Sequence, residues 1–185
     1  MSAADHLRDV LHLVSGALVW PVLAGLLLLA ALILVALGSV LRQAWDRARG
    51  RLTDLDRDRA EVDAAASEPA GDRDIAIEAA LQAAERRRWR EVTRVRLAVR
   101  LGPALGLMGT LIPMAHALQG LADGNLPALA SHMVTAFAAT VVGLAISVIA
   151  FVLAAVRDGW VRRDLEVLTF HAERVARRAA GEMHP

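Results

Sequence analysis

The sequence predicts an all-α integral membrane protein with three transmembrane helices. Hydrophobic residues make up 56% of the 185 residues, and they are gathered into long blocks rather than spread along the chain. Each block exceeds the roughly 20 apolar residues that a helix needs to cross a bilayer. Between the blocks the chain is rich in charge, so we expect the membrane helices to continue as long helices into the cytoplasm.

The first apolar block gives the first transmembrane helix, predicted at 17–41. The block is too long for the core of a signal peptide and is preceded by two acids, so we expect it to be retained. Residues 1–16 are predicted to form an amphipathic helix that lies at the outer face of the membrane that the chain spans. Its apolar residues recur at helical spacing: Leu7, Val10, Leu11 and Val14.

The middle segment, 42–99, is predicted to form a cytoplasmic helical hairpin. Alternating charges indicate one solvated helix over 42–63, and a flexible turn is expected at 64–74 because Pro69 and Gly71 interrupt the pattern. A second helix should then run into the membrane without a break. Its apolar positions keep helical spacing: Ile77, Leu81, Ala84, Val92, Val95 and Val99.

The second and third spans are predicted at 100–121 and 131–156, joined by an outer loop at 122–130. The only charged side chain between Leu101 and Val156 is Asp123, which falls in that loop. A cytoplasmic helix is expected over 157–185. Its apolar residues step by four and three positions and predict a packing seam: Val161, Leu165, Leu168, Ala172 and Val175.

The arginines predict the orientation of the chain. Nearly all of them lie between Arg42 and Arg100 or after Val156, and none lies in the loop between the second and third spans. By the positive-inside rule the N-terminus is outside and the C-terminus inside, an N-out, C-in topology. The chain has no cysteine, which excludes disulfides, thiol catalysis and thiolate metal sites.

Small and hydroxyl-bearing residues fill the second and third spans where a plain anchor would carry Leu and Val. In the third span Ala136, Thr140, Gly143 and Ser147 share one helical face. Small residues allow helix backbones to approach closely in lipid. We therefore predict a helix-packing set of Gly102, Gly106, Gly109, Pro113 and Gly143.

At these spans the sequence resembles the MotA/TolQ/ExbB proton channel family. The second helix of that family carries a segment like LGLxGTVxGIMHAF, which is matched by residues 105–110 and then by His116-Ala117-Leu118. Its third helix carries a segment like APGIAEALxATAIGL, which is matched at Ala136, Ala139-Thr140 and Gly143-Leu144. The similarity covers about residues 100–157.

The resemblance implies a ring-forming subunit of a machine driven by the proton motive force in a bacterial or archaeal inner membrane. The cytoplasmic segment is much shorter than that of a flagellar stator, so a TolQ-like or ExbB-like three-span member, or an uncharacterised branch, fits better. Such a subunit forms a homo-oligomer, expected to be a pentamer, around a single-span partner of the ExbD, TolR or MotB kind that carries a membrane Asp. The transported ion is H⁺, with Na⁺ as the alternative, and no cofactor is expected. The implied proton pathway comprises Thr110, Thr140, Thr135 and His116.

Two departures from the family pattern bear on conduction. Where TolQ-like and ExbB-like sequences carry a Glu five residues before the threonine of the third helix, this chain has Thr135. MotA-like members also lack that acid, so its absence does not exclude conduction. Pro113 stands where the family has Gly, and it removes a backbone hydrogen-bond donor.

Other interpretations of these residues stay open. Thr110 and Thr140 are equally suited to bond a carbonyl one turn back, His132 to lie at the membrane interface, and the Arg86–Arg88 run to serve as a topology signal. The rival function is a non-conducting oligomeric scaffold; a small transporter is weaker, since no inverted repeat is visible. The sequence has no phosphate-binding loop, nucleophile elbow or metal-binding spacing, so we expect neither an enzyme nor a nucleic-acid binder.

Overall fold

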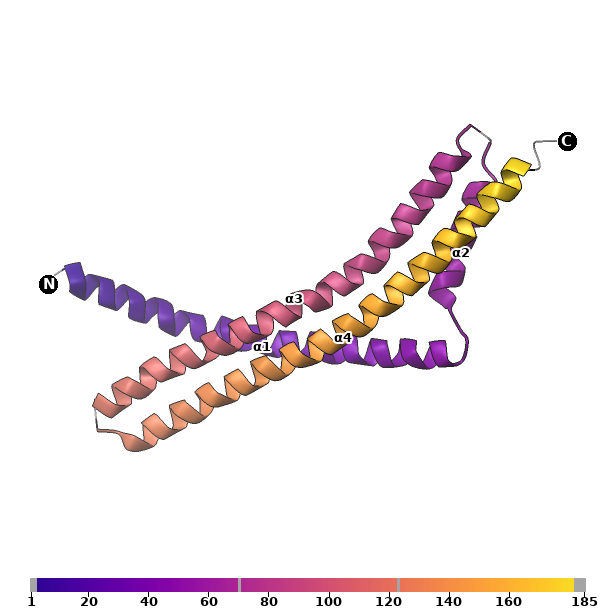
Figure 1. Ribbon diagram of the computed structural model, residues 1–185. Coiled ribbons are helices and arrows are strands. Elements are labelled where there is room, and N and C mark those ends of the chain that lie inside the picture. The colour runs from indigo at the N-terminus through magenta and orange to yellow at the C-terminus, as the bar shows by residue number, and fades with distance from the viewer. Residues whose placement is uncertain (1–2, 70, 123, 182–185) are drawn as a thin grey trace. The chain divides into compact units, whose positions relative to one another are not determined.

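The computed structural model describes residues 3–69, 71–122 and 124–181, and every element in them is an α-helix (Figure 1). The elements are α1 (Ala3–Ala48), α2 (Thr53–Ala66), α3 (Arg73–Ala122) and α4 (Leu126–Gly181). Three helices, α1, α3 and α4, are long and apolar enough to cross a membrane. The predicted all-α class with three helices able to span a bilayer is therefore confirmed.

The N-terminal helix is longer than the sequence pattern indicated. α1 runs without interruption through 3–16 and 17–41, with Pro21 inside it. The helix predicted over 42–63 is instead divided, because Gly50 has a φ of +73° and closes the end of α1. The backbone N–H of Arg51 donates to the carbonyl of Asp46 at 2.9 Å, which caps this end in the manner of a glycine-terminated helix.

The two remaining connections are short. α2 and α3 are separated by residues 67–72, inside the turn predicted at 64–74. In the 122–130 segment, predicted as a loop, helix α4 already begins at Leu126 because the side chain of Asn125 accepts a hydrogen bond from the backbone N–H of Ala128 at 3.1 Å. Pro127 is compatible with this helix start, because the N–H groups of the first helical turn have no partner within the helix. Asp123, predicted to lie in the loop, is outside the described residues.

The chain divides into two compact units. The first, called here the apolar unit, comprises Met1–Ala36 and Val95–Val152, and the second, the polar unit, comprises Leu37–Arg94 and Leu153–Pro185. α1, α3 and α4 each contribute a segment to both units. Each unit has its own means of holding its helices together.

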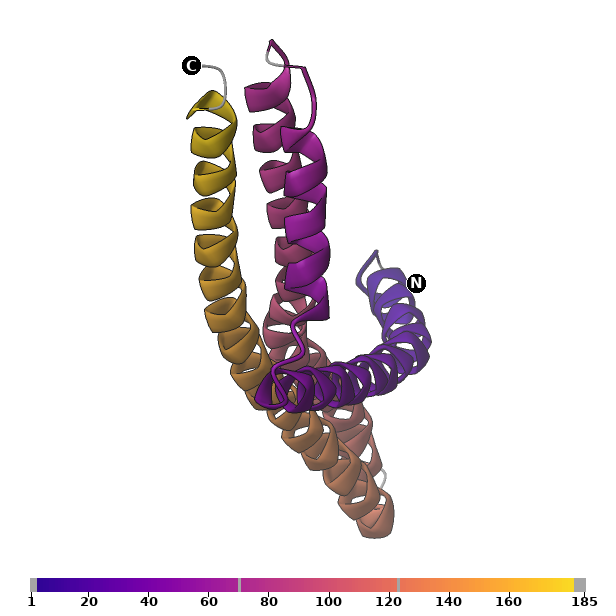
Figure 2. The same cartoon turned by 90° about the vertical axis from the view of Figure 1, so that its right-hand side faces the viewer.

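In the apolar unit α3 and α4 lie side by side, and α1 packs on them (Figures 1 and 2). One stripe of α1 is buried, and the δ-carbon of Leu105 on α3 lies 3.6 Å from the Cβ position of Gly25. Large apolar side chains on the outer faces remain exposed, such as Phe137 at 62% and Val134 at 69%. Exposed apolar surface of this extent suits a lipid environment or neighbouring subunits. The buried stripe of α1 consists of Val22, Leu26, Leu29 and Ile33.

In the polar unit α2 packs with the first part of α3 and the last part of α4. The core of this unit contains one cluster of buried residues: Leu55, Val62, Ile77, Ala84, Leu168 and Ala172. Val161, Leu168 and Ala172 are all buried, which confirms that the predicted seam on the C-terminal helix is a packing surface. The predicted apolar face of α3 is confirmed as well, since Ile77, Ala84 and Val92 are buried in this unit.

Candidate functional site

The contact between α3 and α4 in the apolar unit is made by backbone atoms. A Cβ atom added to Gly102 would lie 2.7 Å from the carbonyl oxygen of Gly143, and one added to Gly143 would lie 2.6 Å from the carbonyl oxygen of Gly102. The same atom on Gly143 would lie 2.8 Å from the Cα of Gly106. Backbone atoms cannot move aside as a flexible side chain can, so any larger residue here would push the helices apart.

The contact continues along both helices toward their connection. A Cβ atom on Gly109 would lie 2.8 Å from the Cβ of Ala139, and Ala117 further along α3 is buried. At the other end, the Ser147 hydroxyl on α4 donates to the backbone carbonyl of Val99 on α3 at 2.8 Å. The sequence placed Ser147 on the small-residue face, but this hydrogen bond between helices was not predicted.

The two threonines of the expected pathway lie at this contact and next to it. Thr140 is half-buried, and its Cα is 3.5 Å from the Cβ position of Gly106. Thr110 is half-buried one helical turn after Gly106, and its hydroxyl donates to the carbonyl of Leu107 at 2.7 Å. A threonine hydroxyl bonded in this way keeps its lone pairs, so it is still able to accept a hydrogen bond from water or from a protonated carboxyl.

Thr135 and His116 occupy a different place in the apolar unit. Both line a pocket of about 230 Å³ between α1, α3 and α4, and neither Thr110 nor Thr140 belongs to its lining. The hydroxyl of the exposed Thr135 donates to the carbonyl of Ser131 at 3.1 Å. The structure thus separates the four expected pathway residues into a pair at the helix contact and a pair at the pocket.

Pro113 is also in the lining of this pocket, together with Gly109. A proline has no N–H, so Pro113 cannot donate the helical hydrogen bond that the carbonyl of Gly109 would normally accept. The helix α3 nevertheless continues through Pro113 to Ala122. The residues that line the pocket therefore include Gly109, whose carbonyl lacks its usual helical donor, in addition to His116 and Thr135.

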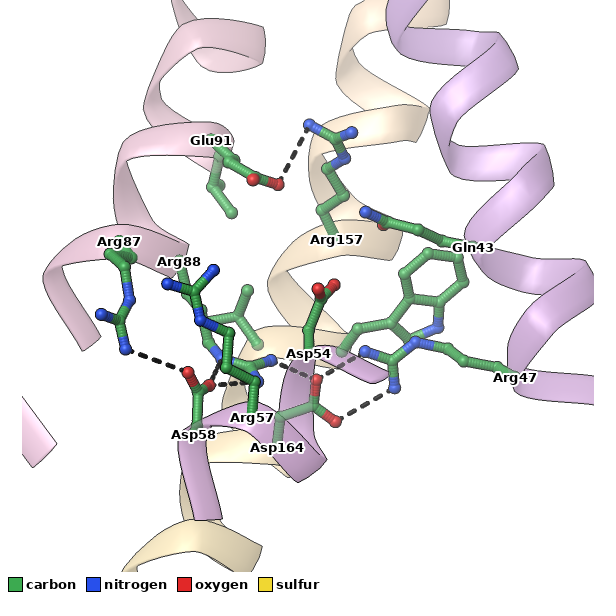
Figure 3. Close-up of a pocket in the computed structure, with 13 residues that line it drawn as sticks. Gln43, Arg47, Asp54, Arg57, Asp58, Arg87, Arg88, Glu91, Arg157 and Asp164 are labelled. Carbon is green, nitrogen blue, oxygen red and sulfur yellow. Dashed lines mark hydrogen bonds and ion pairs between the residues drawn. The ribbon is translucent and has the colours of Figure 1, made fainter. Parts of the chain in front are cut away.

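The polar unit contains a second concentration of polar chemistry, a cluster of buried ion pairs (Figure 3). Asp58 of α2 and Asp164 of α4 are buried, with side chains 6% and 7% exposed. Arg88 of α3 lies between them and donates to both, through its Nε to Asp58 at 2.8 Å and through its Nη1 to Asp164. Arg47 of α1 also donates to Asp164, at 3.0 Å through its Nη1. These side chains border a cavity of about 170 Å³.

This cluster was not predicted, although the sequence contains a signal for it. Asp58 stands three residues after Leu55 and four before Val62, and Asp164 stands likewise between Val161 and Leu168. Each aspartate therefore occupies a position of the apolar seam, where a carboxylate has to be paired. Arg88, within the run considered as a topology signal, makes ion pairs in this unit.

Arg87 adds a more exposed ion pair next to the cluster. Its guanidinium donates to Glu61 at 2.6 Å and to Asp58 at 3.1 Å. The hydrogen bond from Arg87 holds the pKa of Glu61 below its usual value of 4.5, and the same bond raises the pKa of Arg87. Both groups therefore stay charged over the whole neutral range.

The described residues offer no group of three or more His, Cys, Asp or Glu side chains that could hold a metal ion. The concentrated polar chemistry described above thus consists of hydroxyls and imidazoles in the apolar unit and ion pairs in the polar unit.

Comparison with known protein families gives a match to part of the chain. Residues 55–168 match the MotA/TolQ/ExbB proton channel family, a segment that takes in α2, α3 and most of α4. No curated protein and no solved structure matches the chain. Because the matched segment covers well over half of the sequence, this protein belongs to the MotA/TolQ/ExbB proton channel family.

Proposed function

We propose that this protein is the ring-forming subunit of an inner-membrane channel that uses the proton motive force to energise a partner protein. The family consists of multi-pass proton channels of the inner membrane, which are typically transporters rather than enzymes. The three helices able to span a membrane suit that class. Beyond this family membership, we propose that the chain acts as a motor subunit that does work on a partner.

The observation that carries the proposal is the position of Thr140 and Thr110 at the close contact of α3 and α4. Glycine backbones bring the two helices together, the Cα of Thr140 lies 3.5 Å from the Cβ position of Gly106, and Thr110 follows Gly106 by one helical turn. A hydroxyl both donates and accepts, so it can order water or bond a protonated carboxyl without the cost of a buried charge. Thr135 and His116 are proposed to extend the proton path at the pocket.

The proton-carrying carboxylate is proposed to come from a partner. The segments 17–36 and 95–152 contain a single carboxylate, Asp123, in the connection between α3 and α4. Family membership implies a single-span partner of the ExbD, TolR or MotB type, whose membrane Asp would supply the missing acid. This chain would then form a homo-oligomer, a pentamer in the proposal, with H⁺ or Na⁺ as the transported ion.

The topology is also part of the proposal. We place spans at 17–41, 100–121 and 131–156, with the N-terminus and the 122–130 connection outside. The polar unit would then be cytoplasmic, which agrees with its many arginines. The exposed apolar side chains of α3 and α4 would face lipid and neighbouring subunits in the ring.

The test replaces each threonine by valine, which keeps the shape and removes the hydroxyl. In liposomes that contain the chain with its co-purified single-span partner, Thr110→Val and Thr140→Val should abolish proton uptake measured with a pH-sensitive dye. Thr169→Val is the matched control, because Thr169 makes the same kind of bond to a carbonyl of its own helix, at 2.9 Å, in the polar unit. Full proton uptake by both pathway variants would overturn the assignment of these residues.

A second candidate function is a non-conducting oligomeric scaffold. The observation that favours it is that the hydroxyls of Thr110 and Thr135 donate to carbonyls of their own helices, as a purely structural threonine does. Native mass spectrometry of the chain co-expressed with its genomic neighbour separates the two. A pentamer around a pair of Asp-bearing single-span chains supports the motor, whereas a monomer or dimer without such a partner supports the scaffold.

A further inference from the structure

Two histidines meet at the end of the apolar unit where α3 and α4 are connected. The rings of His116 on α3 and His132 on α4 have centroids 5.8 Å apart and are tilted by 32°. Both rings line the pocket of about 230 Å³ that also contains Thr135. Two imidazoles from different helices thus line one pocket that has room for an ion and several waters.

The hydrogen bond of His116 determines which of its ring nitrogens is available. Its Nδ1 lies 3.0 Å from the backbone carbonyl oxygen of Ile112. A carbonyl oxygen only accepts, so Nδ1 carries the proton and Nε2 carries the lone pair. Histidines that bind metals show this arrangement, because the bond from one nitrogen to a carbonyl fixes the ring and makes the other nitrogen a better ligand.

The spacing of the two rings also suits a shared ion. A zinc ion bound to ring nitrogens at about 2.0–2.1 Å holds two imidazole centroids roughly 5–6 Å apart. The observed 5.8 Å falls in that interval. Imidazole is a preferred ligand of borderline dications such as Zn²⁺ and Cu²⁺, and a poor ligand for Mg²⁺ or Ca²⁺.

From the ring spacing and the fixed His116 tautomer, we propose that His116 and His132 form a binding site for Zn²⁺ or a similar transition-metal dication. Water would complete the coordination, and the Thr135 hydroxyl oxygen, whose hydrogen is donated to Ser131, is able to accept a hydrogen bond from such a water. Gly109, whose carbonyl lacks the helical donor that Pro113 cannot supply, is also in the lining of the pocket. A bound ion would tie α3 to α4 beside their connection.

This site does not depend on the proposed motor function. Binding of a dication to two imidazoles requires neither the partner subunit nor proton flow, so it can be tested without them; a bound ion would occupy the Nε2 of His116 and block any proton path through that ring.

The first test is calorimetric titration of the purified full chain with Zn²⁺. His116→Gln and His132→Gln should each weaken one binding event by at least about tenfold, and the double variant should be no worse than the weaker single variant. The control is His171→Gln, because His171 belongs to the polar unit, where its Nε2 lies 2.7 Å from Asp63. Unchanged binding in both pocket variants, or an equal loss in His171→Gln, would overturn the proposal.

A second test uses the unaltered protein and is therefore independent of any effect of substitution on folding. Diethyl pyrocarbonate modifies accessible imidazoles, and peptide mass spectrometry identifies which ones. Zn²⁺ should protect His116 and His132 together and leave His171 reactive, whereas Mg²⁺ should protect neither. Equal modification of the two pocket histidines with and without Zn²⁺ would show that the pair does not bind Zn²⁺. Protection by Mg²⁺ would indicate a site with oxygen ligands instead.

Discussion

The two units of this protein hold their helices together by opposite means. In the apolar unit the absence of side chains allows contact, since Gly102 and Gly143 bring backbone against backbone. In the polar unit, large side chains fill the core, and two buried aspartates are matched by arginines from other helices. A close helix contact of this kind is therefore sensitive to added volume, whereas a buried ion pair in a polar bundle is sensitive to lost charge.

The difference is the one expected if, as proposed, the apolar unit lies in lipid and the polar unit in water. Lipid tails are as apolar as leucine, so burying apolar side chains provides little drive for helix association in a membrane, and close van der Waals contact has to supply it. In a water-exposed bundle the hydrophobic effect associates the helices, and the register can be set by a few specific polar pairs. Adding one methyl group therefore tests the helix contact of the apolar unit, and removing one charge tests the ion pairs of the polar unit.

The largest effect is expected from removing the charge of Asp164 in the polar unit. Asp164→Asn keeps the shape but leaves Arg88, with a side chain 12% exposed, and Arg47 with one fewer counter-charge. Breaking one partner of a buried pair typically costs about 3–5 kcal/mol, because the remaining charge stays desolvated. The free energy of unfolding of the purified chain, followed by circular dichroism in denaturant, measures it.

The control for Asp164→Asn is Asp56→Asn. Asp56 makes an ion pair with Arg59 on the same helix, but its side chain is 66% exposed, so the change should stay within about 0.5 kcal/mol. Equal losses in the two variants would mean that burial of the ion pair does not govern the stability of the polar unit.

A smaller loss is expected from adding one methyl group at the contact of the apolar unit. Gly143→Ala would place a Cβ within 2.6–2.8 Å of backbone atoms of Gly102 and Gly106, and the helices would have to separate. Overpacking of this kind costs about 1–3 kcal/mol. Thermal unfolding in mild detergent should show a lower midpoint for the variant than for the wild-type chain.

Gly159→Ala is the matched control on the same helix. A Cβ added there would meet nothing within 4 Å, so the gain in helix propensity, up to about 1 kcal/mol, should raise the stability. The two alanines should therefore have effects of opposite sign. A Gly143→Ala variant as stable as Gly159→Ala would show that the close backbone contact does not limit the stability of the apolar unit.

The helical class and the three long apolar helices could be predicted because they depend on local pattern. The apolar spacing of Ile77, Ala84 and Leu168 gave the buried faces directly. The helix ends were harder, because they depend on single residues with particular geometry. Gly50 with its positive φ ended α1 inside a segment whose charge pattern looked continuous, and Asn125 began α4 early.

The ion-pair cluster and the histidine pair were not predictable in the same way. Asp58 and Arg88 are far apart in sequence, and the choice of partner depends on how α2, α3 and α4 pack. The same holds for His116 and His132, which sequence reasoning treated as two separate residues. The packing role of the glycines was inferable from their spacing, but the direct contact of Gly102 with Gly143 required the register of the two helices.

The smallest expected effect comes from acid and concerns the exposed edge of the polar cluster. Arg87 lowers the pKa of Glu61 below 4.5 in the folded chain, so the folded state binds the proton more weakly than the unfolded state. The stability from this pair is fully present above the unfolded value near 4.5 and is lost as the pH falls through the lower, folded pKa. Comparing wild-type chain with Glu61→Gln should give a small difference in unfolding free energy at neutral pH that vanishes in acid.

Because Glu61 is partly solvated, the difference should also shrink with added salt, whereas the effect of Asp164→Asn should persist. A Glu61 effect that grows as the pH falls would reverse the assigned sign and would mean that the protonated carboxyl, not the ion pair, stabilises this edge.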